Sequence, residues 1–131
     1  DRLYRLKGEG VTQIVTTHYM DEAEQLCDRL VVMDGGVIVA EGSPGELIAH
    51  YSTREVLELR FAPGTAAPID VVEPLADRVE VLPDRLLLYT GDGEHLQAEL
   101  AHRGVKPMSA LVRRSSLEDV FLRLTGRSLV E

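Results

Sequence analysis

Residues 11–17, with the sequence VTQIVTT, constrain the fold most, because they are rich in β-branched residues and nearly continuous in apolar character. Such a run is typical of a strand that is buried on both faces of a parallel sheet. A parallel sheet needs further strands beside it, yet only a predicted hairpin at residues 29–42 follows closely. We therefore expect the neighbouring strands to lie upstream of residue 1, so that residues 1–50 are the last part of a larger α/β domain.

The elements after this strand are predicted from spacing and from turn chemistry. Residues 20–30 show the apolar spacing of one helical face, which is carried by Ala23, Leu26, Cys27 and Leu30. The hairpin is predicted to turn at residues 34–36, Asp-Gly-Gly. A helix follows with Ser43 as its N-cap, Pro44 at its first position and Glu46 completing a capping box.

The second half of the chain has a different order of elements. Strands are predicted at 54–61, 78–83, 85–90 and 105–114, and helices at 69–77 and 92–104. This β-α-β-β-α-β order is that of an α+β, ferredoxin-like domain, in which two helices cover one face of an antiparallel sheet. An extra helix at 115–126 is predicted to begin with a capping box of Ser115 and Glu118. The domain boundary is expected near 50–54, which gives domains at 1–50 and 51–131.

Composition excludes several classes of protein. The chain has 131 residues and a net charge of −8, and a nucleic-acid surface would need clustered Lys and Arg instead. Cys27 is its single cysteine, so neither an internal disulfide nor a Cys-based zinc site can form. No run approaches 18 consecutive apolar residues, the length that a membrane span needs.

His18 is the main candidate for a catalytic residue. Taken alone, a histidine in a turn is more often hydrogen-bonded to the backbone than catalytic. However, His18 directly follows the carboxyl end of a predicted parallel strand, and ligands of open α/β sheets bind at that edge. An imidazole there can donate a hydrogen bond to a phosphate oxygen.

The stretch VTQIVTTHYMDEAEQLCDRLVVMDGGVIVAEGSPGEL, residues 11–47, resembles the C-terminal part of ATP-binding-cassette (ABC) ATPase subunits. In that family a strand ends in a "switch" histidine, and a Met-Asp-Glu-Ala-Glu helix, a two-stranded segment and a Ser/Thr-Pro-x-Glu-Leu helix follow. The resemblance implies that His18 is the switch histidine, which contacts the γ-phosphate of ATP and helps to position the attacking water. Phosphoryl transfer depends mainly on positioning and charge stabilisation, so one such donor matters greatly.

The chain lacks the other motifs of such an ATPase. It contains no G-x-x-x-x-G-K-[ST] phosphate loop, no Leu-Ser-Gly-Gly signature and no apolar strand ending in the Asp-Glu pair of the magnesium site. In the family these motifs precede the switch histidine. The resemblance therefore implies that ATP and Mg²⁺ are bound by the intact parent protein, and that residues 1–131 alone need no cofactor and hydrolyse no ATP.

The closing stretch SLEDVFLRLTGR, residues 116–127, is similar to the last helix of ATPase subunits of drug exporters of the daunorubicin-resistance type and of related exporters. That resemblance implies an accessory C-terminal domain, a transmembrane permease and a second ATPase subunit as partners, and a place in the cytoplasm at the inner face of the membrane. Multidrug export is the activity that it suggests for the parent protein.

Other polar residues have simpler interpretations. Asp21, Glu22 and Glu24 could suggest a metal site, but acidic residues in a first helical turn are favoured by the helix dipole. His95 and His102 lie seven apart on one helix with no further ligand, and are expected to face solvent.

Three further features are also expected to be structural. Residues 91–93, Gly-Asp-Gly, are interpreted as a strand-to-helix turn rather than a phosphate loop. Arg113 and Arg114 are expected at a solvated strand end, with anion contact as the less favoured alternative. Cys27 is expected on the buried face of its helix.

Two other functions stay open on the sequence. The chain could act without nucleotide as a regulatory or dimerisation module, or its ferredoxin-like domain could sense an amino acid or a metal. Because the strand at 11–17 would expose an unpaired edge without its neighbours, residues 1–131 alone are expected to self-associate.

Overall fold

The computed structural model describes residues 20–126 of the chain. The strand predicted at 11–17, His18 and the start of the chain lie outside the described residues. The described residues form two compact units, one of residues 20–52 together with 116–126, and the other of Thr53–Ser115. In residues 20–126, no helix is long and apolar enough to cross a bilayer.

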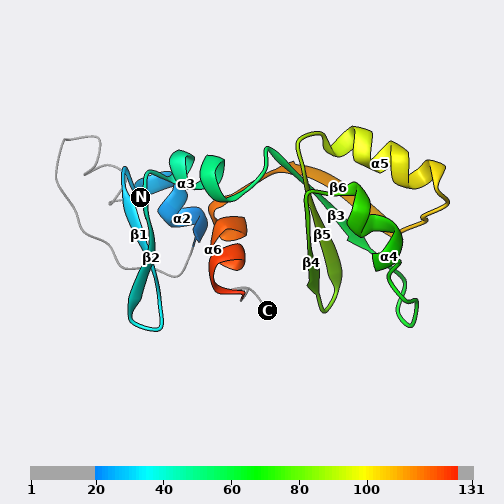
Figure 1. The fold of residues 1–131 in the computed structure, drawn as a ribbon, viewed down its shortest axis with the longest axis horizontal. Helices are drawn as coiled ribbons and strands as arrows, with labels where there is room; N and C mark the ends of the chain where they lie inside the picture. The colour runs from blue at the N-terminus through cyan, green and yellow to red at the C-terminus, as the bar shows by residue number, and fades with distance from the viewer. Residues whose placement is uncertain (1–19, 127–131) are drawn as a thin grey trace. The chain divides into compact units, whose positions relative to one another are not determined.

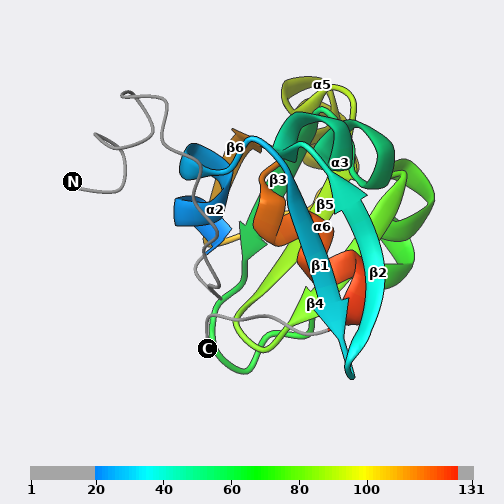
Figure 2. The same ribbon diagram turned by 90° about the vertical axis from the view of Figure 1, so that its left-hand side faces the viewer.

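The first unit contains helix α2 (Met20–Leu26), the hairpin of β1 (Leu30–Asp34) and β2 (Val37–Gly42), helix α3 (Pro44–Tyr51) and helix α6 (Leu117–Thr125) (Figure 1). Strands β1 and β2 pair antiparallel, as Figure 2 shows in a view turned by 90°, and their register shifts between Val32 and Met33. Gly35 and Gly36 form the turn with φ values of 61° and 80°, a conformation that residues with a side chain adopt at a cost. The predicted hairpin is therefore present.

Local sequence also explains how the helices of this unit begin and end. Ser43 caps α3, and its capping box with Glu46 is formed as predicted: the Glu46 N–H donates to Ser43 Oγ at 3.1 Å, and the Ser43 N–H donates to Glu46 Oε1 at 2.9 Å. Helix α2 is shorter than predicted, because it ends at Leu26 and Leu30 already opens β1.

The second unit is a four-stranded antiparallel sheet with helices on one face. Its elements are β3 (Glu55–Arg60), α4 (Ile69–Val72), a 3₁₀ turn η1 (Glu73–Leu75), β4 (Arg78–Leu82), β5 (Arg85–Thr90), α5 (Gly93–His102) and β6 (Ser109–Arg114). The strand order is β4-β5-β3-β6, and all three neighbouring pairs are antiparallel. This arrangement confirms the predicted α+β, ferredoxin-like fold.

The core of the second unit lies between the sheet and helices α4 and α5. It consists of leucines and valines from alternate strand positions and from both helices: Leu57, Leu59, Val72, Leu86, Leu88, Leu96, Leu100 and Val105. Pro74 falls in η1 and so limits α4 to four residues, and Pro107 precedes β6, which is an edge strand.

The closing helix α6 packs in the first unit, because its apolar residues Leu117 and Val120 join Ala23, Val32, Ala40 and Leu47 in one core. Its predicted capping box of Ser115 and Glu118 is wrong by one residue: the Ser116 N–H donates to Asp119 Oδ2 at 2.8 Å, and Ser116 is the N-cap. The functional domain bounds at 1–50 and 51–131 stay a prediction.

Candidate functional site

Helix α2 is the described element nearest in sequence to His18, and it begins two residues later, at Met20. His18 itself lies outside the described residues, so its role as switch histidine stays a prediction. Asp21 and Glu22 are exposed in the first turn of α2, where negative charge stabilises the N-terminus of a helix. Ala23 on the opposite side is buried in the core of the first unit.

Glu24, in the second turn of α2, contacts the start of the closing helix. Its Oε1 accepts a hydrogen bond from the backbone N–H of Leu117 at 2.8 Å. Leu117 is the first residue of α6, and the first N–H groups of a helix have no acceptor within the helix. A carboxylate at this position is favoured both by the hydrogen bond and by the helix dipole.

The remaining contacts of α6 hold it against the same unit. Asp119, which is 2% exposed, accepts the N–H of Ser116, so the side chains of Glu24 and Asp119 satisfy two successive N–H groups at this helix start. Near its end, the Arg123 Nη1 donates to the carbonyl oxygen of Tyr51, the last residue of α3. Helix α6 therefore bonds to α2 at one end and to α3 at the other.

These contacts change the interpretation of the acidic helix. In residues 20–126, no group of three or more His, Cys, Asp or Glu side chains could hold a metal ion. Glu24 has a structural partner instead, and sequence reasoning missed it because Leu117 lies 93 residues away along the chain.

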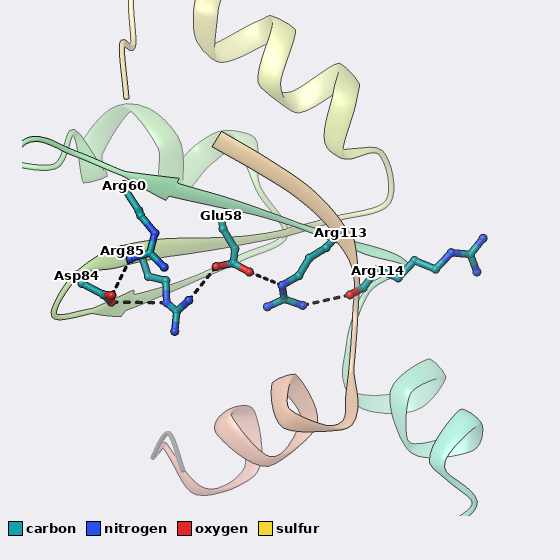
Figure 3. Close-up of polar contacts among 6 residues, drawn as sticks. All are labelled: Glu58, Arg60, Asp84, Arg85, Arg113 and Arg114. Atoms are coloured by element: carbon teal, nitrogen blue, oxygen red, sulfur yellow. Dashed lines mark hydrogen bonds and ion pairs between the residues drawn. The ribbon is translucent and has the colours of Figure 1, made fainter. Parts of the chain in front are cut away.

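A second group of charged residues lies on the face of the sheet opposite to α4 and α5. Because Leu57 and Leu59 point towards the helices, Glu58 and Arg60 between and after them point to the other face. Figure 3 shows Glu58 between Arg85 and Arg113, with Asp84 next to Arg60 and Arg85. Arg78 forms a further ion pair with Glu80 and covers the ring of the buried Tyr89, with its Cζ 3.9 Å from the ring centroid.

Glu58 is the centre of this network. Its side chain is only 12% exposed, and its two oxygens are used by different partners: Oε1 accepts from Arg85 Nη1 at 3.0 Å, and Oε2 accepts from Arg113 Nε at 2.5 Å. At its rim, the hydrogen bond from Arg60 lowers the pKa of Asp84 below its ordinary value. Four guanidinium groups, from Arg60, Arg78, Arg85 and Arg113, face three carboxylates, from Glu58, Glu80 and Asp84. The network is therefore nearly neutral and is an element of stability.

The predictions for the other polar residues have mixed outcomes. Arg113 lies at the end of β6 as predicted, but its guanidinium binds Glu58 instead of being solvated; Arg114 is exposed and points away from the network (Figure 3). His95 and His102 are exposed, which confirms the prediction for both.

The structure also describes the turn at residues 91–93 and the thiol of Cys27. Asp92 caps α5 by accepting the N–H of His95 at 3.0 Å, so the predicted strand-to-helix turn is confirmed. Cys27 follows α2 and packs, partly buried, against the core of the first unit.

Comparison with known proteins shows similarity along the whole chain. Residues 65–126 match the family described as the C-terminal domain of the nodulation factor export protein NodI. The chain is 44% identical over 129 residues to the Nod factor export ATP-binding protein I of Rhizobium sp. (strain N33). The aligned residues cover 98% of this chain and 41% of that protein. It is 42% identical over 129 residues to the protein of the same name from Paraburkholderia xenovorans, and these residues cover 98% of this chain and 41% of that relative.

A third relative, from Mesorhizobium japonicum, is 40% identical over 131 residues, which cover 100% of this chain and 38% of the relative. The chain therefore spans about two fifths of the length of these relatives. The predicted resemblance to the C-terminal part of an ABC exporter ATPase subunit is confirmed.

Proposed function

We propose that the intact protein binds and hydrolyses ATP to drive export across a membrane. The reason is that the chain is similar over its whole length to the C-terminal part of an ABC exporter ATPase subunit. The observation that carries this proposal is the similarity of 98% of the chain to proteins named as export ATP-binding proteins. ATP with Mg²⁺ is the substrate. We assign none of residues 20–126 as a ligand of the Mg²⁺ ion.

We further propose that His18 is the switch histidine of this ATPase. It lies two residues before helix α2, whose Met-Asp-Glu-Ala-Glu sequence the family shares. An imidazole N–H there would donate to the γ-phosphate and orient the attacking water, and this positioning is a main source of rate in phosphoryl transfer.

The partners that fit this function are a transmembrane permease and a second ATPase subunit. The protein would then lie in the cytoplasm at the inner face of the membrane. The names of the relatives favour export of a Nod factor-like molecule, whereas the closing-helix sequence also fits a drug exporter of the daunorubicin-resistance type. Transport assays with both substrate classes, in cells that also make the permease, would separate these two possibilities.

Residues 1–131 alone are proposed to self-associate through the first unit. The hairpin exposes four large apolar side chains, with Val31 at 47%, Met33 at 55%, Val37 at 62% and Ile38 at 59% exposure. Met33 and Ile38 are cross-strand partners in the hairpin, and exposed apolar side chains that are neighbours favour association. Sedimentation of residues 1–131 as a monomer at high concentration would contradict this proposal.

The function is tested by comparing the intact protein with residues 1–131. We expect the intact protein to release phosphate from MgATP, and residues 1–131 to bind no fluorescent ATP analogue, because the phosphate-loop sequence is absent from them. An intact protein that neither binds nor hydrolyses ATP would overturn the proposal and favour a regulatory or dimerisation module.

A further inference from the structure

We propose that strand β6 is an interaction edge of the sheet unit, and that it pairs antiparallel with β6 of a second copy of this chain. Leu111 would lie opposite the partner's Leu111 at a two-fold axis, and the two sheets would join into one continuous sheet. This inference goes beyond the proposed function, because it uses residues of the sheet unit alone and needs neither ATP nor the permease.

Strand β6 has one edge without a neighbouring strand. In the sheet of the second unit, with the strand order β4-β5-β3-β6, β6 pairs with β3 alone. Such an edge presents a row of N–H and C=O groups that can pair with another strand. Natural edge strands are commonly protected by charges, prolines or bulges, and residues 109–112 of β6 contain none of these. This part of the edge is therefore suited to pairing.

The backbone of β6 shows which residues face the edge. The Ser115 N–H donates to the carbonyl oxygen of Arg54 at 3.2 Å, and the register of β3 and β6 continues to this pair of residues. In an antiparallel pair, hydrogen-bonded positions alternate with positions whose backbone groups point away from the neighbouring strand. The N–H and C=O groups of Ala110 and Val112 therefore point away from β3, towards the edge.

Leu111, between these two residues, provides the side-chain contact. Its side chain is 56% exposed, and it lies directly opposite Glu58, so it points to the sheet face that α4 and α5 do not cover. Met108, directly before the strand, is 63% exposed. The middle of the edge therefore exposes apolar surface that a second strand would cover.

One register of self-pairing suits both the backbone and the side chains. With Leu111 opposite the partner's Leu111, Ala110 of each copy lies opposite Val112 of the other, and their edge-facing N–H and C=O groups can bond. Leu111 then occupies the position without ladder bonds, where side chains of antiparallel strands are closest. A shift by two residues would place Leu111 opposite the partner's Arg113 or Ser109, and the contact between the two leucines would be lost.

The charges of β6 favour a second copy as the partner. The strand carries its charges at one end only, at Arg113 and Arg114. In the antiparallel register these two arginines lie opposite the partner's Ser109 and Met108, and Arg113 keeps its bond to Glu58 within its own sheet. A parallel arrangement would place the arginines of both copies side by side, which is unfavourable. The strand is thus complementary to itself in the antiparallel direction.

Disulfide cross-linking tests the register. The intact protein is compared as wild type, Leu111→Cys and Ser109→Cys, under mild oxidation and without nucleotide, so that association that requires ATP is excluded. The two thiols of Leu111→Cys would lie across the two-fold axis with their Cα atoms about 4.5 Å apart, within the range that a disulfide bridges. We expect a dimer on a non-reducing gel for this variant.

Ser109→Cys is the matched control. Ser109 is also exposed and lies on the same face of β6, but in the proposed register its two copies would be about 14 Å apart. This distance is too long for a disulfide, so Ser109→Cys should yield no more dimer than the wild type. No cross-link in Leu111→Cys, or an equal amount in Ser109→Cys, would overturn the inference.

Sedimentation measures the same contact without a cross-link. Leu111→Lys would place two like charges opposite each other at the axis, and we expect it to raise the dissociation constant of the dimer by about tenfold or more. Both proteins are measured with Met33→Lys, which suppresses the association proposed for the hairpin of the first unit. An unchanged dissociation constant would contradict the inference.

Two further readouts separate the possible failures. Circular dichroism checks that Leu111→Lys folds, and if it does not, the cross-link of Leu111→Cys decides alone. Phosphate release from MgATP by the wild type tests the proposed function separately. A protein that forms the Leu111→Cys cross-link but hydrolyses no ATP would overturn the proposed function and leave this inference standing.

Discussion

Replacing Glu58 by glutamine should destabilise the sheet unit more than any other single change in its charged network. Glu58 is 12% exposed and accepts one hydrogen bond from Arg85 and another from Arg113. Glutamine has nearly the same shape, but its amide nitrogen must face one of the two guanidinium groups, where donor meets donor. The variant therefore loses one charge-assisted bond and removes the negative charge that lies between Arg85 and Arg113.

The magnitude follows from the exposure of the partners. A hydrogen bond to a charged group contributes roughly 1.5–3 kcal/mol, and leaving a buried charge unpaired costs several kcal/mol. Arg85 and Arg113 are 25% and 28% exposed, so water compensates part of the loss. We expect the free energy of unfolding to fall by about 2 kcal/mol.

Urea unfolding of residues 1–131, followed by circular dichroism and by the fluorescence of tyrosine, measures this change. Tyr89 is fully buried in the same sheet and reports on it directly. With a slope of roughly 1–2 kcal/mol per M, the midpoint of the sheet transition should fall by about 1–2 M. Asp84→Asn is the control, because Asp84 is 59% exposed at the rim of the network. A loss in Glu58→Gln no larger than that in Asp84→Asn would refute the reasoning.

Two further predictions concern the packing around a glycine at the start of α5 and the loss of stability at low pH. Gly93→Ala should cost about 1–3 kcal/mol of stability in urea unfolding, because its Cβ would lie 2.5 Å from Val112 Cγ1, whereas Gly91→Ala meets no atom within 4 Å and should cost less. The backbone N–H of Ser43 lowers the pKa of Glu46 below its ordinary value of 4.5, so this carboxylate stabilises the fold above that pH and its contribution is lost as the pH falls through the lowered pKa. Melting temperatures at decreasing pH should therefore fall more steeply for the wild type than for Glu46→Gln, and parallel curves would contradict this.

Local signals in the sequence predicted most of the elements. Capping residues, glycine turns and prolines act within a few residues, and they fixed α3, the hairpin and the β-α-β-β-α-β order. The predicted start of α6 was wrong by one residue, because Ser115 with Glu118 and Ser116 with Asp119 have the same capping-box spacing. Tertiary pairing decides between them: the Ser115 N–H donates to the carbonyl oxygen of Arg54, which directly precedes β3, so the helix begins after Ser116.

The partners of these elements could not be predicted in the same way. Nothing near Leu117 in sequence indicates that its N–H meets Glu24, or that α6 packs with the first unit. For Glu58 a partial signal exists, because charged residues alternate with buried leucines along β3 and so must share the other face. Which arginines they meet depends on the strand order, and this requires the folded sheet.

The proposed role of His18 is tested most directly by measuring ATP hydrolysis and nucleotide binding separately in a His18 variant. In the intact protein we expect His18→Ala to lower kcat for ATP hydrolysis by about 100-fold or more, because a donor to the transferred phosphate is lost. The Kd for MgATP should remain nearly unchanged, and His95→Ala, which alters an exposed histidine of α5, should hydrolyse ATP at the wild-type rate. A His18→Ala protein with wild-type kcat would contradict the account.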